Sequence, residues 1–251
     1  LWDVAATYYN MEKYNEAKRY YLKAFQNATD EDNKEDLSYY IGQSSFKMKN
    51  YKESISWFKK IQSRDDLLYR TDVYMGDAYY NSNQYDSALT CYLKAEEHYK
   101  TFNKDNLATI LNIQGKCYKA LGKYPEALNV YERAIKADPT FKEAYWNKGV
   151  VYANQKNYKD AILWYKKAIP LYEDTKESMY TLYGNISACA ENMGDFEEMI
   201  KWKEKQAGYS SDMCLEYYKV AATQYGKMNK PKDAENTCKK AIDLYLKEKT
   251  G

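Results

Sequence analysis

Apolar residues recur along this chain at the spacing of amphipathic helices. The segment GKYPEALNVYERAIKADP, residues 122–139, illustrates the pattern and has a proline near each of its ends. Pro125 suits the first turn of a helix, where a missing N–H breaks no hydrogen bond, and Pro139 suits a position beyond the last turn. We expect one helix here, preceded by a turn at Gly122, and Gly194 is expected to mark a turn of the same kind.

The helical pattern repeats. In the template segment, Gly115 is followed by aromatic residues 3, 9 and 16 positions later and by alanines 12 and 19 positions later. The same offsets select small and aromatic residues in four other segments, and two later segments match more weakly. The first residue of each match, here called the anchor, lies 37, 34, 39, 34, 38 and 35 residues from the next. The seven anchors are Ala5, Gly42, Gly76, Gly115, Gly149, Ser187 and Ala222.

Four of these anchors are glycines inside predicted helices. A glycine in a helix interior costs about 0.8–1.0 kcal/mol relative to alanine. Such a cost is tolerated repeatedly only where a side chain would obstruct something. We therefore expect a partner helix to approach closely at each anchor glycine, with tyrosines filling the gaps that the small residues leave.

The repeat resembles the tetratricopeptide repeat, a helix-turn-helix unit, over essentially the whole chain. The match is strongest from Gly76 to Ala168 and weakest at Lys203 and Gln206, where we expect Trp202 to provide the packing instead. The resemblance implies an all-α fold, a right-handed superhelical solenoid of antiparallel helix pairs in which units contact mainly their neighbours. It predicts a single domain over residues 1–251, with units at about 1–33, 35–67, 69–105, 108–140, 142–178, 180–212 and 215–249.

Composition narrows the function. Hydrophobic residues make up 45% of the chain, which argues against wholesale disorder, and the net charge of only +2 provides no strong field for nucleic acid. No apolar run approaches the length of a membrane span. The five cysteines form no CxxC pair and are odd in number, so we expect reduced thiols and a cytoplasmic location.

The sequence contains no recognisable reaction centre. It has no P-loop, GxGxxG or HExxH motif, and its one histidine, His98, makes a Cys/His zinc site improbable. Cys117 and Cys189 occupy equivalent repeat positions and are interpreted as packing residues. We interpret Glu96 and Glu97 as a solvated helix face and His98 as a solvated residue. No enzyme activity, cofactor or metal is therefore expected.

The resemblance also implies a binding surface, because the first helices of such units line a concave groove that holds a peptide. Trp146 is a candidate binding hot spot there, and packing against a neighbouring helix is an equally weighted alternative. Some family members hold a chaperone carboxylate with a Lys and, four residues later, an Asn; Asn112 and Lys116 have the reverse order, which argues against that clamp. The repeat offsets place eight residues on this wall: Tyr39, Gln43, Val73, Asp77, Asn112, Lys116, Trp146 and Asn147.

The sequence thus favours a protein-binding scaffold whose partner is a peptide of mixed polar and aromatic character. The alternative is a sensor or regulatory region of a larger signalling protein, transcriptional regulator or transferase. Leu1 falls inside its unit, so the first helix is expected either to be shortened or to continue upstream. The last helix is only partly polar, which leaves end-to-end self-association open.

Overall fold

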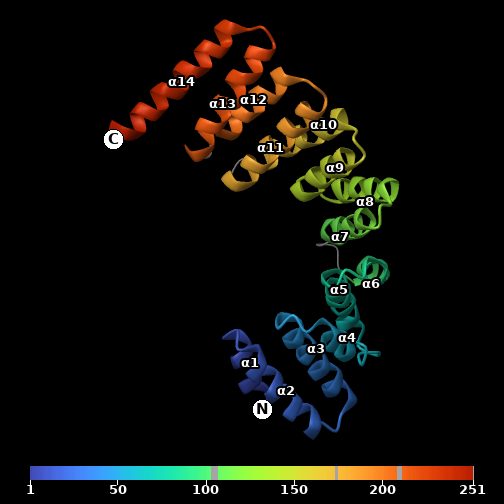
Figure 1. Ribbon diagram of the computed structural model, residues 1–251. Coiled ribbons are helices and arrows are strands. Elements are labelled where there is room, and N and C mark those ends of the chain that lie inside the picture. The colour runs from blue at the N-terminus through green and yellow to red at the C-terminus, as the bar shows by residue number, and fades with distance from the viewer. Residues whose placement is uncertain (103–106, 173–174, 208–210, 251) are drawn as a thin grey trace. The chain divides into compact units, whose positions relative to one another are not determined.

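The computed structural model describes residues 1–102, 107–172, 175–207 and 211–250 (Figure 1). Within these ranges the chain is all-helical, with fourteen α-helices, one short 3-10 helix and no strand. The helices are α1 (Trp2–Asn10), α2 (Tyr14–Asn27), α3 (Glu31–Lys47), α4 (Tyr51–Phe58), α5 (Asp65–Asn81), α6 (Tyr85–Phe102), α7 (Leu107–Ala120), α8 (Tyr124–Ala137), α9 (Lys142–Asn154), α10 (Tyr158–Ala168), the 3-10 helix η1 (Ile169–Leu171), α11 (Lys176–Asn192), α12 (Phe196–Ala207), α13 (Ser211–Lys227) and α14 (Pro231–Thr250).

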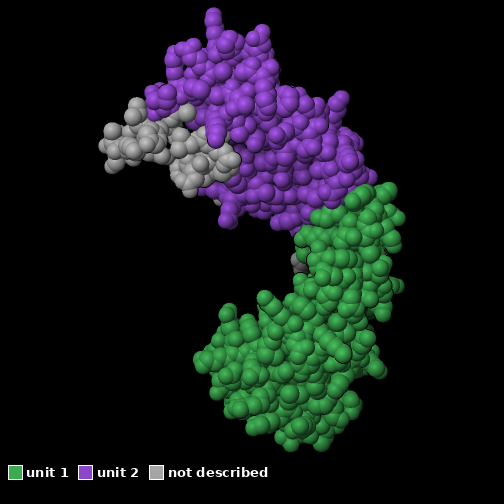
Figure 2. Space-filling view, in the orientation of Figure 1, with its two compact units in different colours: residues 1–137 green, residues 138–251 purple. Residues whose placement is uncertain are grey.

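The chain forms two compact units (Figure 2). Unit 1, Leu1–Ala137, contains the four helix pairs α1–α2, α3–α4, α5–α6 and α7–α8. Unit 2, Asp138–Gly251, contains the three pairs α9–α10, α11–α12 and α13–α14. Within each unit, helices contact mainly the helices next to them in the chain. The predicted all-α repeat of about seven helix pairs is confirmed, and the single continuous domain stays a prediction.

Each first helix of a pair ends in the same way. The residue seven positions after the anchor has a positive φ in all seven repeats. At Gly122 (φ 72°) the Lys123 amide donates to Tyr118 O at 2.9 Å, which reverses the chain into α8. Glycine adopts this left-handed conformation without a steric penalty. The predicted turn glycines, Gly122 and Gly194, are thus confirmed, and the five equivalent residues are Glu12, Lys49, Asn83, Lys156 and Asn229.

The anchor glycines lie directly beneath aromatic rings. A Cβ atom built on Gly76 would lie 2.6 Å from Cε1 of Tyr92, closer than real Cβ atoms approach other atoms. Gly42 is covered by Phe58, Gly149 by Tyr165, and Gly115 by Tyr131. The close approach is therefore confirmed, and the group that needs the space is the ring sixteen residues after each glycine.

Alanines and rings alternate across each helix pair. The alanines twelve residues after the anchors are fully buried at Ala17, Ala88, Ala127 and Ala161. In the second repeat the equivalent residue is Ser54, whose hydroxyl donates to Gly42 O at 2.8 Å. Large and small side chains that interdigitate in this way are typical of close-packed protein cores.

The sixth repeat departs from the pattern as the sequence predicts. Trp202 is buried in the core of unit 2 and contacts the ring of Tyr183 at a centroid distance of 5.4 Å. Three residues before the anchor Ser187, a Cβ on Gly184 would lie 2.7 Å from the amide nitrogen of Gln206. Trp202 therefore replaces the missing aromatic residue at Lys203.

The connection from α4 to α5 is held by one buried carboxylate. Glu35, on α3, accepts hydrogen bonds from the backbone N–H groups of Gln62, Ser63 and Arg64 at 3.0–3.3 Å. Burial alone would raise the pKa of Glu35, but these donors lower it below its ordinary value. The loop is thereby tied to the first helix of its own repeat.

Candidate partner-binding surface

The eight predicted surface residues all lie on first helices. In unit 1 they occupy α3, α5 and α7, and in unit 2 they occupy α9. Their exposure separates them into two groups. Tyr39, Gln43 and Asn112 are buried, whereas the other five are half-buried and reach the surface in part. The buried three can support a surface but cannot supply most of its contacts.

Tyr39 belongs to an aromatic cluster that joins α3 to its neighbours. Its ring lies 6.0 Å from the ring of Tyr74 on α5 and 6.0 Å from that of Phe58 on α4, centroid to centroid. Burial and the neighbouring Tyr74 raise the pKa of Tyr39 to about 12. Tyr39 is therefore a packing residue with its hydroxyl kept protonated.

Asp77 and Lys116 form a polar junction between α5 and α7. The hydroxyl of Tyr92 donates to Oδ1 of Asp77 at 2.6 Å. Burial raises the pKa of Asp77, while the Tyr92 hydrogen bond and the charge of Lys116 act in the opposite direction. The sequence offsets thus bring together a carboxylate and an ammonium group on adjacent first helices, with Val73 one turn before Asp77.

Trp146 is half-buried in unit 2 and packs edge-on against Tyr172, with ring centroids 5.5 Å apart. The Nζ atom of Lys142 lies over the Tyr172 ring, 4.7 Å from its centroid. Asn147, the next residue, is also half-buried. Part of the Trp146 side chain therefore packs against a neighbouring ring, as one of the two alternatives predicts, and the rest of it is exposed.

Sequence reasoning missed an aromatic column made of ring pairs, each of which joins the first helix of a repeat to the second. The residue four positions after the anchor contacts the tyrosine nine positions after it in each of the first three repeats. Their ring centroids are 5.2–5.6 Å apart. The repetition of this offset was the signal that could have found the column. The pairs are Tyr9–Tyr14, Phe46–Tyr51 and Tyr80–Tyr85.

The three buried thiols are poor nucleophiles. Burial raises the pKa of Cys117 to about 12 and that of Cys189 to about 11, so both stay protonated near neutral pH. Cys91 is also buried, and its pKa is raised to about 11. Cys238 is exposed, and the side chain of Cys214 lies outside the described residues. The three buried thiols, those of Cys91, Cys117 and Cys189, are packing groups.

Two polar residues differ from their predicted solvated state. Glu96 is buried, accepts a hydrogen bond from Gln114 Nε2 at 3.0 Å and is paired with Arg133. His98 is partly buried, with Nε2 3.7 Å from Oδ2 of Asp72. The periodicity of α6 alone could not reveal this, because the burying groups come from α5, α7 and α8. Glu97, in contrast, is exposed as predicted.

We also searched the described part of the chain for metal sites and for membrane-spanning helices. There, no three His, Cys, Asp or Glu side chains gather in a way that could hold a metal ion. In the same part, every helix is too short or too polar to span a bilayer.

Comparison with curated proteins finds plant relatives of part of the chain. The chain is 31% identical over 124 residues to the Hsp70-Hsp90 organizing protein of Triticum aestivum, covering 46% of this chain and 21% of that protein. It is 31% identical over 139 residues to the Hsp70-Hsp90 organizing protein 2 of Arabidopsis thaliana, covering 53% and 22%. The chain thus spans about a fifth of the length of these relatives.

Solved structures share the fold. The C-terminal part of a TPR repeat-containing protein from Cytophaga hutchinsonii superposes with a TM-score of 0.75 at 15% identity, covering 97% of this chain and 95% of that one. The apo form of RapI gives a TM-score of 0.67 at 15% identity, covering 100% and 98%. MamA gives 0.60 at 20% identity, covering 70% and 91%.

Family comparison agrees with the repeat that the sequence and the helix pairs display. Three models described as tetratricopeptide repeat match residues 2–30, 67–140 and 114–174, which together make up more than half of the chain. The same offsets and the same left-handed turn position recur through these segments, and a ring covers the anchor at Gly76, Gly115 and Gly149. The chain belongs to the tetratricopeptide repeat family.

Proposed function

We propose that this chain is a non-catalytic scaffold that binds a partner protein through the first helices of its repeats. The observation that carries the proposal is the repeat itself. Its aromatic and small residues pack the helices of each pair together and so hold the first helices in place. A rigid, preformed surface loses little conformational entropy when a partner docks. The relatives named Hsp70-Hsp90 organizing proteins support a protein as the partner.

The half-buried residues indicate the partner's chemistry. Asp77 and Lys116 present both signs of charge, while Val73 and Trp146 present apolar surface. We expect each unit to contact a peptide segment of mixed polar and aromatic character. The reversed order of Asn112 and Lys116, together with the burial of Asn112, argues against a carboxylate clamp.

Trp146 provides the first test. Peptides are selected from a random library on the whole chain, and their Kd values are measured by fluorescence anisotropy. We expect Trp146→Ala to weaken the selected peptide at least about tenfold, because a large aromatic side chain is a typical hot spot. Leu163→Ala, which truncates an exposed residue on the second helix α10, is the matched control and should leave the Kd unchanged.

Trp146→Phe separates binding from packing, because phenylalanine retains a ring against Tyr172. Thermal melts establish that each variant is folded. Unchanged affinity in a folded Trp146→Ala variant would exclude Trp146 as an anchor. Failure of the whole chain to select any peptide would argue against the scaffold function itself.

A further inference from the structure

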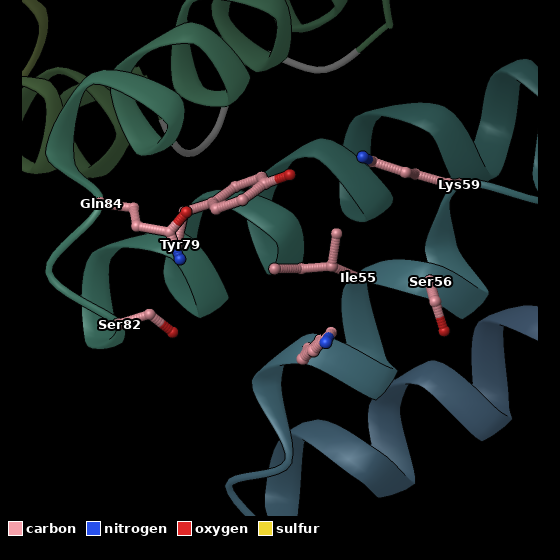
Figure 3. Close-up of a pocket in the computed structure, with 7 residues that line it drawn as sticks. Ile55, Ser56, Lys59, Tyr79, Ser82 and Gln84 are labelled. Carbon is pink, nitrogen blue, oxygen red and sulfur yellow. The ribbon is translucent and has the colours of Figure 1, made fainter.

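A pocket with a volume of about 420 Å³ lies in unit 1, and none of the predicted surface residues lines it. It is lined by α4 and by the end of α5 with the turn that follows. Figure 3 shows the side chains of Lys59 and Tyr79 extending toward one another from α4 and α5, with Ile55 beneath them. Its lining residues are Lys52, Ile55, Ser56, Lys59, Tyr79, Ser82 and Gln84.

The charge of this pocket is positive and uncompensated. It is lined by two lysines and by no acidic residue. Among the described residues, Lys52 and Lys59 make no ion pair, although lysines of this chain pair readily elsewhere. The hydroxyls of Ser56 and Ser82 already donate to the carbonyls of Glu53 and Ala78. The donors left for a ligand are the two ammonium groups, the Tyr79 hydroxyl and the Gln84 amide.

The fifth repeat shows which group pairs with a lysine at the position of Lys59. Lys59 lies seventeen residues after its anchor, as Lys166 does in the fifth repeat. Lys166 Nζ lies 2.6 Å from a carboxylate oxygen of Glu198, which is eleven residues after the next anchor. Lys18, which lies only thirteen residues after its anchor, pairs with the same acidic position of the next repeat, at Glu53, at 2.9 Å.

The acidic position is filled in six of the seven repeats. The exception is the third repeat, where Ser87 occupies this position. Serine cannot neutralise an ammonium group. The second repeat therefore has Lys59, while the third repeat has no carboxylate at the acidic position. The acidic residues at the other six positions are Glu16, Glu53, Glu126, Asp160, Glu198 and Asp233.

We propose that this pocket binds a Glu or Asp side chain from an acidic segment of a partner protein, in place of the carboxylate that the third repeat lacks. Lys59 and Lys52 bind the carboxylate, and Tyr79 and Gln84 supply further donors. Ile55 and the Tyr79 ring offer apolar surface to the neighbouring residue of the segment. Tyr79 belongs to the first helix α5, but none of the eight candidate surface residues lines the pocket, so the inference can stand or fall without the proposed function.

The test uses two fluorescent peptides that differ only in their acidic residues. One contains Glu residues around a central Leu, and the other has Gln in place of each Glu. Anisotropy titrations of the whole chain should give a Kd at least about tenfold lower for the Glu peptide, since a lost charge-assisted contact of about 1.4 kcal/mol corresponds to that factor. Amide NMR signals of Ile55, Ser82 and Gln84 should shift on binding.

Variants assign the effect to the pocket. Lys59→Gln should weaken the Glu peptide at least about tenfold. Ser87→Glu should do the same by supplying an internal carboxylate, without removing any lysine. Lys136→Gln removes an equal charge from an exposed position on α8 and should change the Kd little. Trp146→Ala should leave this binding unchanged, which separates it from the surface on the first helices.

Four outcomes would overturn the proposal. These are equal affinity for the two peptides, equal losses from Lys59→Gln and Lys136→Gln, displacement of the Glu peptide by inorganic phosphate at equal concentration, and a Lys59-dependent dimer in sedimentation that excludes the peptide. The third would assign the pocket to a phosphate group, and the last would assign it to a second copy of the chain.

Discussion

Replacing Gly115 with leucine should lower the free energy of unfolding by about 3 kcal/mol or more. The first atom that any side chain adds at this position meets the ring of Tyr131, which is itself fully buried. Overpacking a close-packed core costs about 1–3 kcal/mol, and a four-carbon side chain places this substitution at the upper end. Urea denaturation followed by circular dichroism measures the loss.

Gly226 supplies the matched control. It lies near the end of α13, and a Cβ built on it meets nothing within 4 Å. Gly226→Ala should therefore leave the stability unchanged or raise it by up to about 1 kcal/mol, because alanine is the better helix former. Equal stability of Gly115→Leu and the parent chain would disprove the account of the anchor glycines.

Two equivalent tyrosines should respond in opposite directions when each loses its hydroxyl. Tyr92 donates its hydroxyl hydrogen to Asp77 at 2.6 Å. The Tyr131 hydroxyl is buried and has no hydrogen-bond partner among the described residues. The residue equivalent to Asp77 in that repeat is Lys116, which offers no acceptor. Tyr92→Phe should therefore cost about 2 kcal/mol, and Tyr131→Phe should stabilise the chain by about 1 kcal/mol.

The pair is its own control, because both substitutions remove the same oxygen from the same repeat position. Denaturation curves at neutral pH give the two differences directly. A loss of similar size in both variants would mean that the hydroxyls act through something other than the Asp77 contact.

The repeat predicted most of the fold because its physical cause is local. The anchor glycines, the rings sixteen residues later and the turn glycines all act within one helix pair, so spacing alone locates them. The replacement of an aromatic residue by Trp202 could be anticipated for the same reason. The positive φ of Lys49 or Lys156 could not, since nothing in their side chains favours it.

The candidate surface was predicted less completely because exposure depends on neighbouring repeats. Offsets place Tyr39 and Asn112 on first helices correctly, but they do not reveal that adjacent helices bury both side chains. The prediction that Glu96 is solvated was wrong for the same reason, since its partners Gln114 and Arg133 belong to the following repeat. The pocket at Lys59 involves two repeats as well. The sequence alone reveals only that Ser87 replaces the usual acidic residue of the third repeat.

Hydrogen–deuterium exchange on the whole chain with a selected peptide tests the central claim most directly. If the first helices bind the partner, the peptide should slow exchange in the segments that carry Val73, Asp77 and Lys116 on α5 and α7, or Trp146 on α9. The second helices α6, α8 and α10 should then exchange at unchanged rates. Protection confined to those second helices would contradict the account.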